Sequence, residues 1–130
     1  MFGLARNPKQ AYASVGIETD IATANPVKLV IMLYDGAILA LASARAAIEQ
    51  GDVPTRGQRI SKAIEIISDG LKSSLDHQAG GELADRLAAL YDYMCSRLIY
   101  ANANANVPAI DEVVALLTEL KSAWEGIHQP

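Results

Sequence analysis

Cysteine and aromatic residues are both scarce in this sequence. The 130 residues include one cysteine, Cys95, so no disulfide can form within the chain, as is typical of proteins from a reducing compartment. Aromatic residues make up 5% although hydrophobic residues make up 51%, so most apolar side chains are Ala, Leu, Ile and Val. This composition favours closely packed helices over an aromatic-rich β-sandwich.

Positive charge and long hydrophobic runs are scarce as well. The 11 Lys and Arg are outnumbered by 15 Asp and Glu, and the basic residues form no cluster. We therefore expect no binding to nucleic acid, which needs a basic face. Asp35 and Arg45 interrupt the longest apolar runs, so no run reaches the ~20 residues that a transmembrane helix needs. Residues 1–9 contain no apolar segment of the kind found in a secretory signal peptide. The expectation is a cytoplasmic protein without stable membrane insertion.

Apolar residues recur at helical spacing in four segments. The stripe of the third segment is Leu83, Leu87, Leu90, Met94, Leu98 and Ala101, and that of the fourth is Ile110, Val113, Val114, Leu117, Leu120 and Trp124. Asn25 and Pro26 suit the N-cap and first position of a helix, and Asn106 suits the N-cap of the last helix. The segment 79–81 contains two glycines and is expected to end the second helix. The predicted helices run, approximately, over residues 26–50, 54–78, 82–101 and 107–126.

Four amphipathic helices joined by short connections pack with sequence neighbours antiparallel. We therefore expect an all-α protein, an antiparallel up-down-up-down four-helix bundle over residues 23–127. Residues 1–22 show no sustained period and are interrupted by Pro8 and Gly16. A flexible N-terminal arm is expected there.

The first predicted helix is apolar over more than one face. Its main stripe is accompanied by a second apolar row made of Leu29, Met32, Leu33, Gly36, Leu39 and Ala40. A peripheral helix buries only one face, so a second apolar row is not expected on it. Two interpretations stay open: the extra surface serves self-association or a thicker core, or it forms a groove for an amphipathic partner segment.

The residues with catalytic potential form no recognisable catalytic arrangement. Cys95 falls in mid-helix beside the core residue Met94, which favours an inert thiol, and His77 is expected to be solvated. Glu125 and His128 form one E-x-x-H motif, whereas di-iron bundles need two such motifs and further core glutamates. We expect no catalytic, cofactor-binding or metal-binding residues, with a metal or redox bundle enzyme as the alternative.

A short Leu-Tyr-Asp motif occurs twice, at 33–35 and at 90–92, and hints at a duplicated helical hairpin. Asp35 and Asp92 follow a tyrosine in mid-helix, where aspartate has low helix propensity. Each of them is either a solvated or structurally hydrogen-bonded residue, or a polar anchor at the edge of a binding groove.

Several stretches, taken in order, resemble the FliS family of flagellar export chaperones. They include Tyr12 near the N-terminus, ETDIATANPVKLVIMLYDGAI at 18–38, GGELADRLAALYDYMCSRLIYAN at 80–102 and IDEVVALLTELKSAWEGI at 110–127. The resemblance covers nearly the whole chain from residue 11. The Ala- and Asn-rich loop at 101–106 and the glycine within 55–58 depart from the family's usual pattern.

The resemblance implies a non-enzymatic four-helix bundle that binds the disordered C-terminal segment of flagellin in the cytosol. Binding would block premature polymerisation, and the chaperone would present its client to the flagellar export gate. A homodimer and a purely structural oligomer stay open. The resemblance also implies that the N-terminal arm caps a hydrophobic site. The residues that match family positions and are expected at the partner site are Tyr12, Tyr34, Asp35, Leu90, Tyr91, Tyr93 and Leu98.

Overall fold

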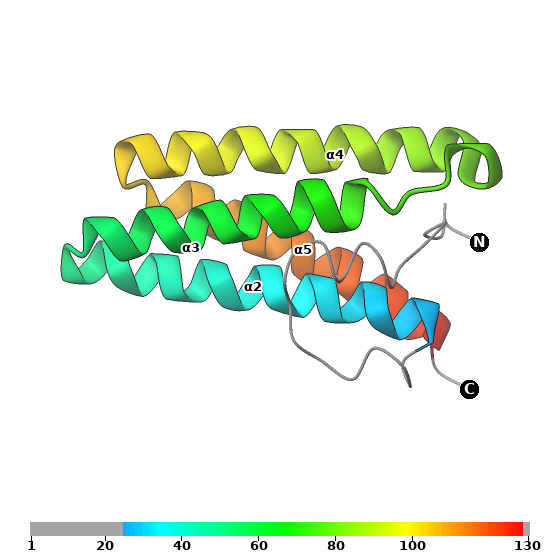
Figure 1. Ribbon diagram of the computed structural model, residues 1–130, viewed down its shortest axis with the longest axis horizontal. Helices are drawn as coiled ribbons and strands as arrows, with labels where there is room; N and C mark the ends of the chain where they lie inside the picture. The colour runs from blue at the N-terminus through cyan, green and yellow to red at the C-terminus, as the bar shows by residue number, and fades with distance from the viewer. Residues whose placement is uncertain (1–24, 129–130) are drawn as a thin grey trace.

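The computed structural model describes residues 25–128, which form an all-helical bundle (Figure 1). Its elements are α2 (Pro26–Gln50), α3 (Val53–Glu65), the π-helix η2 (Ile66–Lys72), α4 (His77–Asn104) and α5 (Val107–His128). Helix α2 packs against α3 and α5, and α4 packs against the same two neighbours. The expected all-α fold of four mutually packed helices is confirmed. The predicted arm at residues 1–22 lies outside the described residues.

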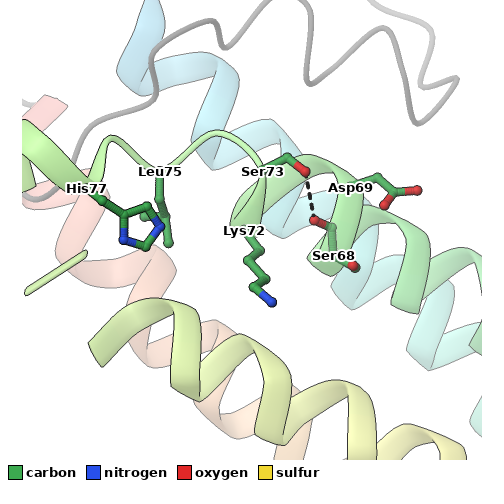
Figure 2. Close-up of a pocket in the computed structure, with 6 residues that line it drawn as sticks. All are labelled: Ser68, Asp69, Lys72, Ser73, Leu75 and His77. Carbon is green, nitrogen blue, oxygen red and sulfur yellow. Dashed lines mark hydrogen bonds between the residues drawn. The ribbon is translucent and has the colours of Figure 1, made fainter. Parts of the chain in front are cut away.

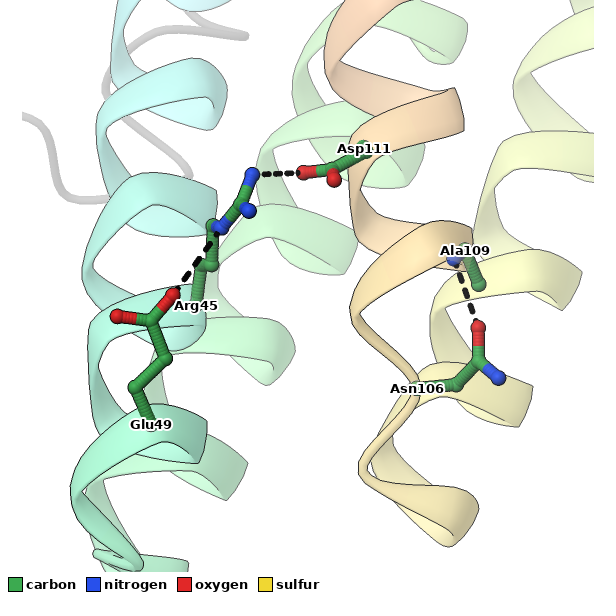
Figure 3. Close-up of polar contacts among 5 residues, drawn as sticks. All are labelled: Arg45, Glu49, Asn106, Ala109 and Asp111. Atoms are coloured by element: carbon green, nitrogen blue, oxygen red, sulfur yellow. Dashed lines mark hydrogen bonds and ion pairs between the residues drawn. The ribbon is translucent and has the colours of Figure 1, made fainter.

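Side-chain caps place several helix ends where the sequence predicts them. The Asn25 side chain accepts a hydrogen bond from the Lys28 amide at 2.8 Å, and Asn106 accepts one from the Ala109 amide at 2.8 Å (Figure 3). Helix α2 ends at Gly51, whose φ of 70° is readily adopted by glycine. The predicted starts of the first and fourth helices are therefore confirmed.

The predicted end of the second helix is wrong. Helix α3 continues into the π-helix η2, which ends at Lys72, and Asp76 then caps α4 by accepting from the amides of Gln78 and Ala79. Gly81, with φ 52° and ψ −130°, makes a kink inside α4. The glycine pair thus bends the third helix after one turn and does not end the second. Helix α4 also continues to Asn104, beyond the predicted end at residue 101.

The core contains most residues of the predicted apolar stripes of all four helices, with α2 supplying ten buried residues. By length and composition α2 also resembles a membrane span, since an 18-residue window of it has a mean hydropathy of 1.8. Half of that window is buried inside the bundle, and a central helix of a globular protein passes the same test. The second apolar row of α2 is thus largely accounted for by burial, while Leu39 remains 73% exposed.

Candidate functional site

The candidate site is an apolar groove along the seam between α4 and α5. A hydrogen bond of 2.5 Å from the Tyr93 hydroxyl to Glu112 sets the antiparallel register of the two helices. In this register, leucines recur every three or four residues on both sides of the seam. We call this apolar strip the α4–α5 groove. It consists of Leu83, Leu87, Leu120 and Ala123, which line a pocket, and of Leu90, Leu116 and Ile127, which helical spacing places on the same faces of α4 and α5.

A pocket of about 140 Å³ lies in this groove, between the N-terminal part of α4 and the C-terminal part of α5. The pocket is lined by Leu83, Leu87, Leu120, Ala123 and Trp124. Leu83 is 40% exposed at its rim, although the sequence places this residue on a buried stripe. Since carbon atoms dominate the lining, the pocket suits an aliphatic or aromatic group.

A polar network closes the groove at the level of Tyr93. Glu112 accepts hydrogen bonds from the Tyr93 hydroxyl and from the Arg97 Nε, the latter at 2.8 Å. These two bonds lower the pKa of Glu112, while the bond to Glu112 raises the pKa of Tyr93. The Arg97 guanidinium also stacks on Tyr100, 4.9 Å from the ring centroid. The groove therefore has an apolar floor and one charged end.

Two tyrosine side chains form a buried hydrogen bond inside the bundle. The hydroxyls of Tyr34 on α2 and Tyr91 on α4 lie 2.5 Å apart. Burial raises the pKa of Tyr34 and raises that of Tyr91 well above its ordinary value. Both phenols are thus neutral at physiological pH, and their bond joins α2 and α4.

The residues expected at the partner site do not gather at one place in the structure. Tyr34, Tyr91 and Leu98 are buried in the core, Leu90 is half-buried in the α4–α5 groove, and Tyr93 is exposed at its charged end. Asp35 is exposed on α2, away from this groove, and Tyr12 lies outside the described residues. Their roles in partner binding stay predictions.

The pocket adds residues that sequence reasoning assigned only to the core or left out. Trp124 and Leu120 were expected on a buried stripe, and Ala123 was not singled out. Helical spacing alone shows only roughly which face of a helix a side chain occupies. It therefore does not distinguish residues inside the core from residues at the edge of the core. In the sequence, only the closeness of Leu120 and Ala123 to Trp124, the single tryptophan, pointed to a site at these residues.

The two aspartates of the repeated Leu-Tyr-Asp motif each pair with a lysine of a neighbouring helix. Asp35 pairs with Lys121 of α5 at 2.6 Å, and Asp92 pairs with Lys72 of η2 at 2.7 Å. The bond to Asp35 raises the pKa of Lys121. Each aspartate therefore forms an ion pair with the neighbouring helix, which favours the structural interpretation over a polar anchor for a partner.

The seam between α2 and α5 is bridged by a further ion pair. Arg45 lies 2.6 Å from Asp111 of α5 and 3.5 Å from Glu49 of its own helix (Figure 3). Together with the pair formed by Asp35 and Lys121, this contact places two charged bridges along the seam. The α2–α5 seam is therefore more polar at its surface than the α4–α5 groove.

A second pocket, of about 400 Å³, lies where η2 ends and α4 begins (Figure 2). Ser73 donates from its hydroxyl to the Ser68 carbonyl oxygen, and Lys72 points toward α4, where it pairs with Asp92. His77 is hydrogen-bonded to Asp85 at 2.7 Å. These polar groups are thus already engaged within the chain, and the pocket does not match an apolar segment.

The described residues offer no arrangement for metal binding. Between residues 25 and 128, no group of three or more His, Cys, Asp or Glu side chains is placed to hold a metal ion. Glu125 lies 4.0 Å from Lys121, and the side chain of His128 lies outside the described part. Burial and the nearby Asp92 raise the pKa of Cys95, which keeps its thiol protonated and weakly nucleophilic.

The fold and the groove define an all-helical bundle protein with an apolar groove on its surface. A sequence profile described as flagellar protein FliS matches residues 8–130, so the chain belongs to the FliS family of flagellar secretion chaperones.

Two relatives are similar to this chain over most of its length. The flagellar secretion chaperone FliS of Salmonella typhimurium is 48% identical over 118 residues, which cover 91% of this chain and 87% of that protein. The flagellar secretion chaperone FliSB of Pseudomonas aeruginosa is 45% identical over 123 residues, 95% of this chain and 97% of that protein. A crystal structure of a bacterial flagellar chaperone shows the same fold, with a TM-score of 0.74 at 24% identity, covering 91% of this chain and 94% of that one.

Proposed function

We propose that this protein binds the disordered C-terminal segment of flagellin in the cytoplasm, prevents its premature polymerisation and delivers it to the flagellar export gate. Membership of a family of flagellar secretion chaperones supports a flagellar client. The single structural observation that carries the proposal is the α4–α5 groove, an apolar strip with a pocket of about 140 Å³.

The chemistry of the groove suits an amphipathic segment of a filament protein. Such a segment presents apolar side chains every three or four residues, and these would otherwise associate with other subunits. Leu83, Leu90 and Leu120 offer matching apolar surface at the same spacing along the seam. Burying the segment in the groove removes its apolar stripe from water and so prevents contacts between subunits.

The N-terminal arm is proposed to act as a lid on the same site, with Tyr12 as its main contact. The described chain starts at Asn25, and the start of α2 lies at the same end of the bundle as the end of α5 (Figure 1). The pocket opens near that end, because it includes the first turns of α4 after the kink and the last turns of α5. The preceding 24 residues therefore begin within reach of the groove.

The proposal is tested by co-purification with the organism's own flagellin, with and without its last ~40 residues, enough for one or two helices of ~30 Å. Full-length flagellin should be retained and the truncated form lost. Equal retention of both forms would place the bound segment elsewhere. A chaperone that elutes as a stable homo-oligomer and retains neither form would instead be a structural oligomer.

A further inference from the structure

The two ends of the α4–α5 groove differ in chemistry. At one end lies the pocket, which is lined by apolar side chains that include Leu83 and Leu120. At the other end, the side chain of Arg97 crosses the seam from α4, and its Nε donates to Glu112 of α5 at 2.8 Å. The stretch of α4 from Leu83 to Tyr93 spans ~15 Å, which matches about three turns of a bound helix. A helical segment in the groove therefore has one end at the pocket and the other end at Arg97.

Contacts on two sides hold the Arg97 guanidinium in place before any partner binds. Besides its bond to Glu112, the guanidinium stacks on Tyr100, with 4.9 Å between its central carbon and the ring centroid. Glu112 is itself held by the Tyr93 hydroxyl, which donates to it at 2.5 Å. The Arg97 side chain is nevertheless 33% exposed. Because its rotamer is already restricted, Arg97 loses little conformational entropy when a partner binds to it.

The free polar atoms at this end of the groove are hydrogen-bond donors. A guanidinium has five N–H donors and no acceptor. Within residues 25–128, the Nε of Arg97 makes a hydrogen bond, whereas its two terminal nitrogens make none. The two oxygens of Glu112 each accept a bond already, one from Tyr93 and one from Arg97. A partner at this end is therefore expected to bring acceptors.

The two ends of a helix differ in the polar groups that they leave unbonded. The last four carbonyl groups lack partners within the helix and carry partial negative charge, whereas the first four N–H groups carry partial positive charge. An arginine near a helix C-terminus can donate to those carbonyls, and its charge interacts favourably with the helix dipole. An N-terminus at the same place would put N–H donors against the donors of Arg97.

We infer that Arg97 binds the C-terminal end of the helical client segment, so that the client runs parallel to α4 and antiparallel to α5. The N-terminal turns of the segment then lie at the pocket. The inference rests on the proposed function for the identity of the client, whereas the direction follows from Arg97. The acceptors are the carbonyls of the last turn and, where the segment ends the client chain, its terminal carboxylate.

Nitroxide labels on a peptide from the flagellin C-terminus test the direction in the full-length chaperone. A label at the C-terminal end of the peptide should broaden the amide NMR signals of residues 93–100 and 108–112. A label at the N-terminal end should broaden those of residues 82–87 and 120–127. The reversed pattern, or equal broadening of both regions by each label, would overturn the inference alone. A peptide that does not bind the wild type would contradict the proposed function and, with it, the inference.

Two arginines of α4 provide a matched pair of variants. Arg86 pairs with Glu82 and precedes Leu87 of the pocket, so Arg86→Gln removes the same charge at the other end of the groove. Arg97→Gln should raise the Kd of the peptide about two- to tenfold, and Arg86→Gln less than about twofold. With an amidated peptide, the effect of Arg97→Gln should persist if the carbonyls accept its hydrogen bonds and shrink if the carboxylate does. An equal increase in both variants, or an unchanged Kd in Arg97→Gln, would overturn the role of Arg97.

Discussion

Filling the pocket from its exposed side should abolish much of the client binding without harming the fold. Ala123 lines the pocket and is itself exposed on α5, so Ala123→Leu adds three carbon atoms where the client side chain is expected. Burial of a leucine-like side chain contributes about 1.5–3 kcal/mol, and losing it corresponds to a Kd about 10- to 150-fold higher. Because the new side chain covers Leu83 and Leu87, the free energy of unfolding should stay equal or rise by about 0.5–2 kcal/mol.

Isothermal titration calorimetry with a flagellin C-terminal peptide measures the Kd, and denaturant unfolding measures the stability. Ala46→Leu is the matched control, because Ala46 is also an exposed alanine but lies on α2, outside the α4–α5 groove. The control should leave the Kd within about twofold of wild type, which corresponds to ~0.4 kcal/mol. An unchanged Kd for Ala123→Leu, or an equal loss in both variants, would refute the assignment of the groove.

Four other predictions follow from the packing and the charges. Leu117→Ala should lower the free energy of unfolding by about 2–5 kcal/mol, and Leu90→Ala by less, because Leu117 is fully buried and Leu90 is only half-buried; denaturant unfolding compares them. Asn106→Ala should cost about 0.5–2 kcal/mol through loss of the cap on α5, and the same assay would show no change if the cap contributed nothing. Raising the salt from low to moderately high concentration should change the Kd for the client less than about tenfold, because apolar burial dominates; a steep dependence would assign the main role to charges. Burial raises the pKa of Tyr34 and Tyr91 in the folded state, so above about pH 10 the unfolded chain releases protons that the folded chain keeps. The free energy of unfolding should therefore fall as the pH rises. In unfolding experiments between about pH 8 and pH 11, a Tyr34→Phe variant should show a shallower fall than wild type.

Helix positions were predictable where a local signal determines them. Asn25 and Asn106 act as caps through their own side chains, and both were recognised. The break between the second and third helices was missed because two signals compete there. Asp76 is an N-cap, but it precedes a turn that contains the glycine pair, and a sequence alone does not tell a kink at Gly81 from a helix end.

The π-helix η2 carried no recognisable signal. Its residues, Ile66–Lys72, continue the helical stripe of α3, and the wider hydrogen bonding of a π-helix depends on how this segment packs against its neighbours. Local propensity does not encode that packing.

The candidate site was predictable only in part, because burial depends on the partner helix. Leu90 and Leu98 lie on one predicted stripe, yet Leu98 is fully buried and Leu90 lies at the rim of the seam. The repeated Leu-Tyr-Asp motif contains two residues that contact each other in the fold, and the spacing of apolar residues does not reveal this contact. Its two tyrosines, Tyr34 and Tyr91, meet in the core, although α2 and α4 lie diagonally across the bundle and each packs mainly against α3 and α5.

Site-specific photo-crosslinking tests the location of the client most directly. A photoreactive side chain replaces Leu83, at the rim of the pocket, in one variant and Leu39, on the outer face of α2, in the other. Leu39 is 73% exposed and Leu83 40%, so non-specific apolar contact would favour crosslinking from position 39. The account predicts crosslinks to the flagellin C-terminal segment from position 83 and few from position 39. Crosslinking from position 39 alone, or equally from both, would contradict the assignment of the α4–α5 groove as the client site.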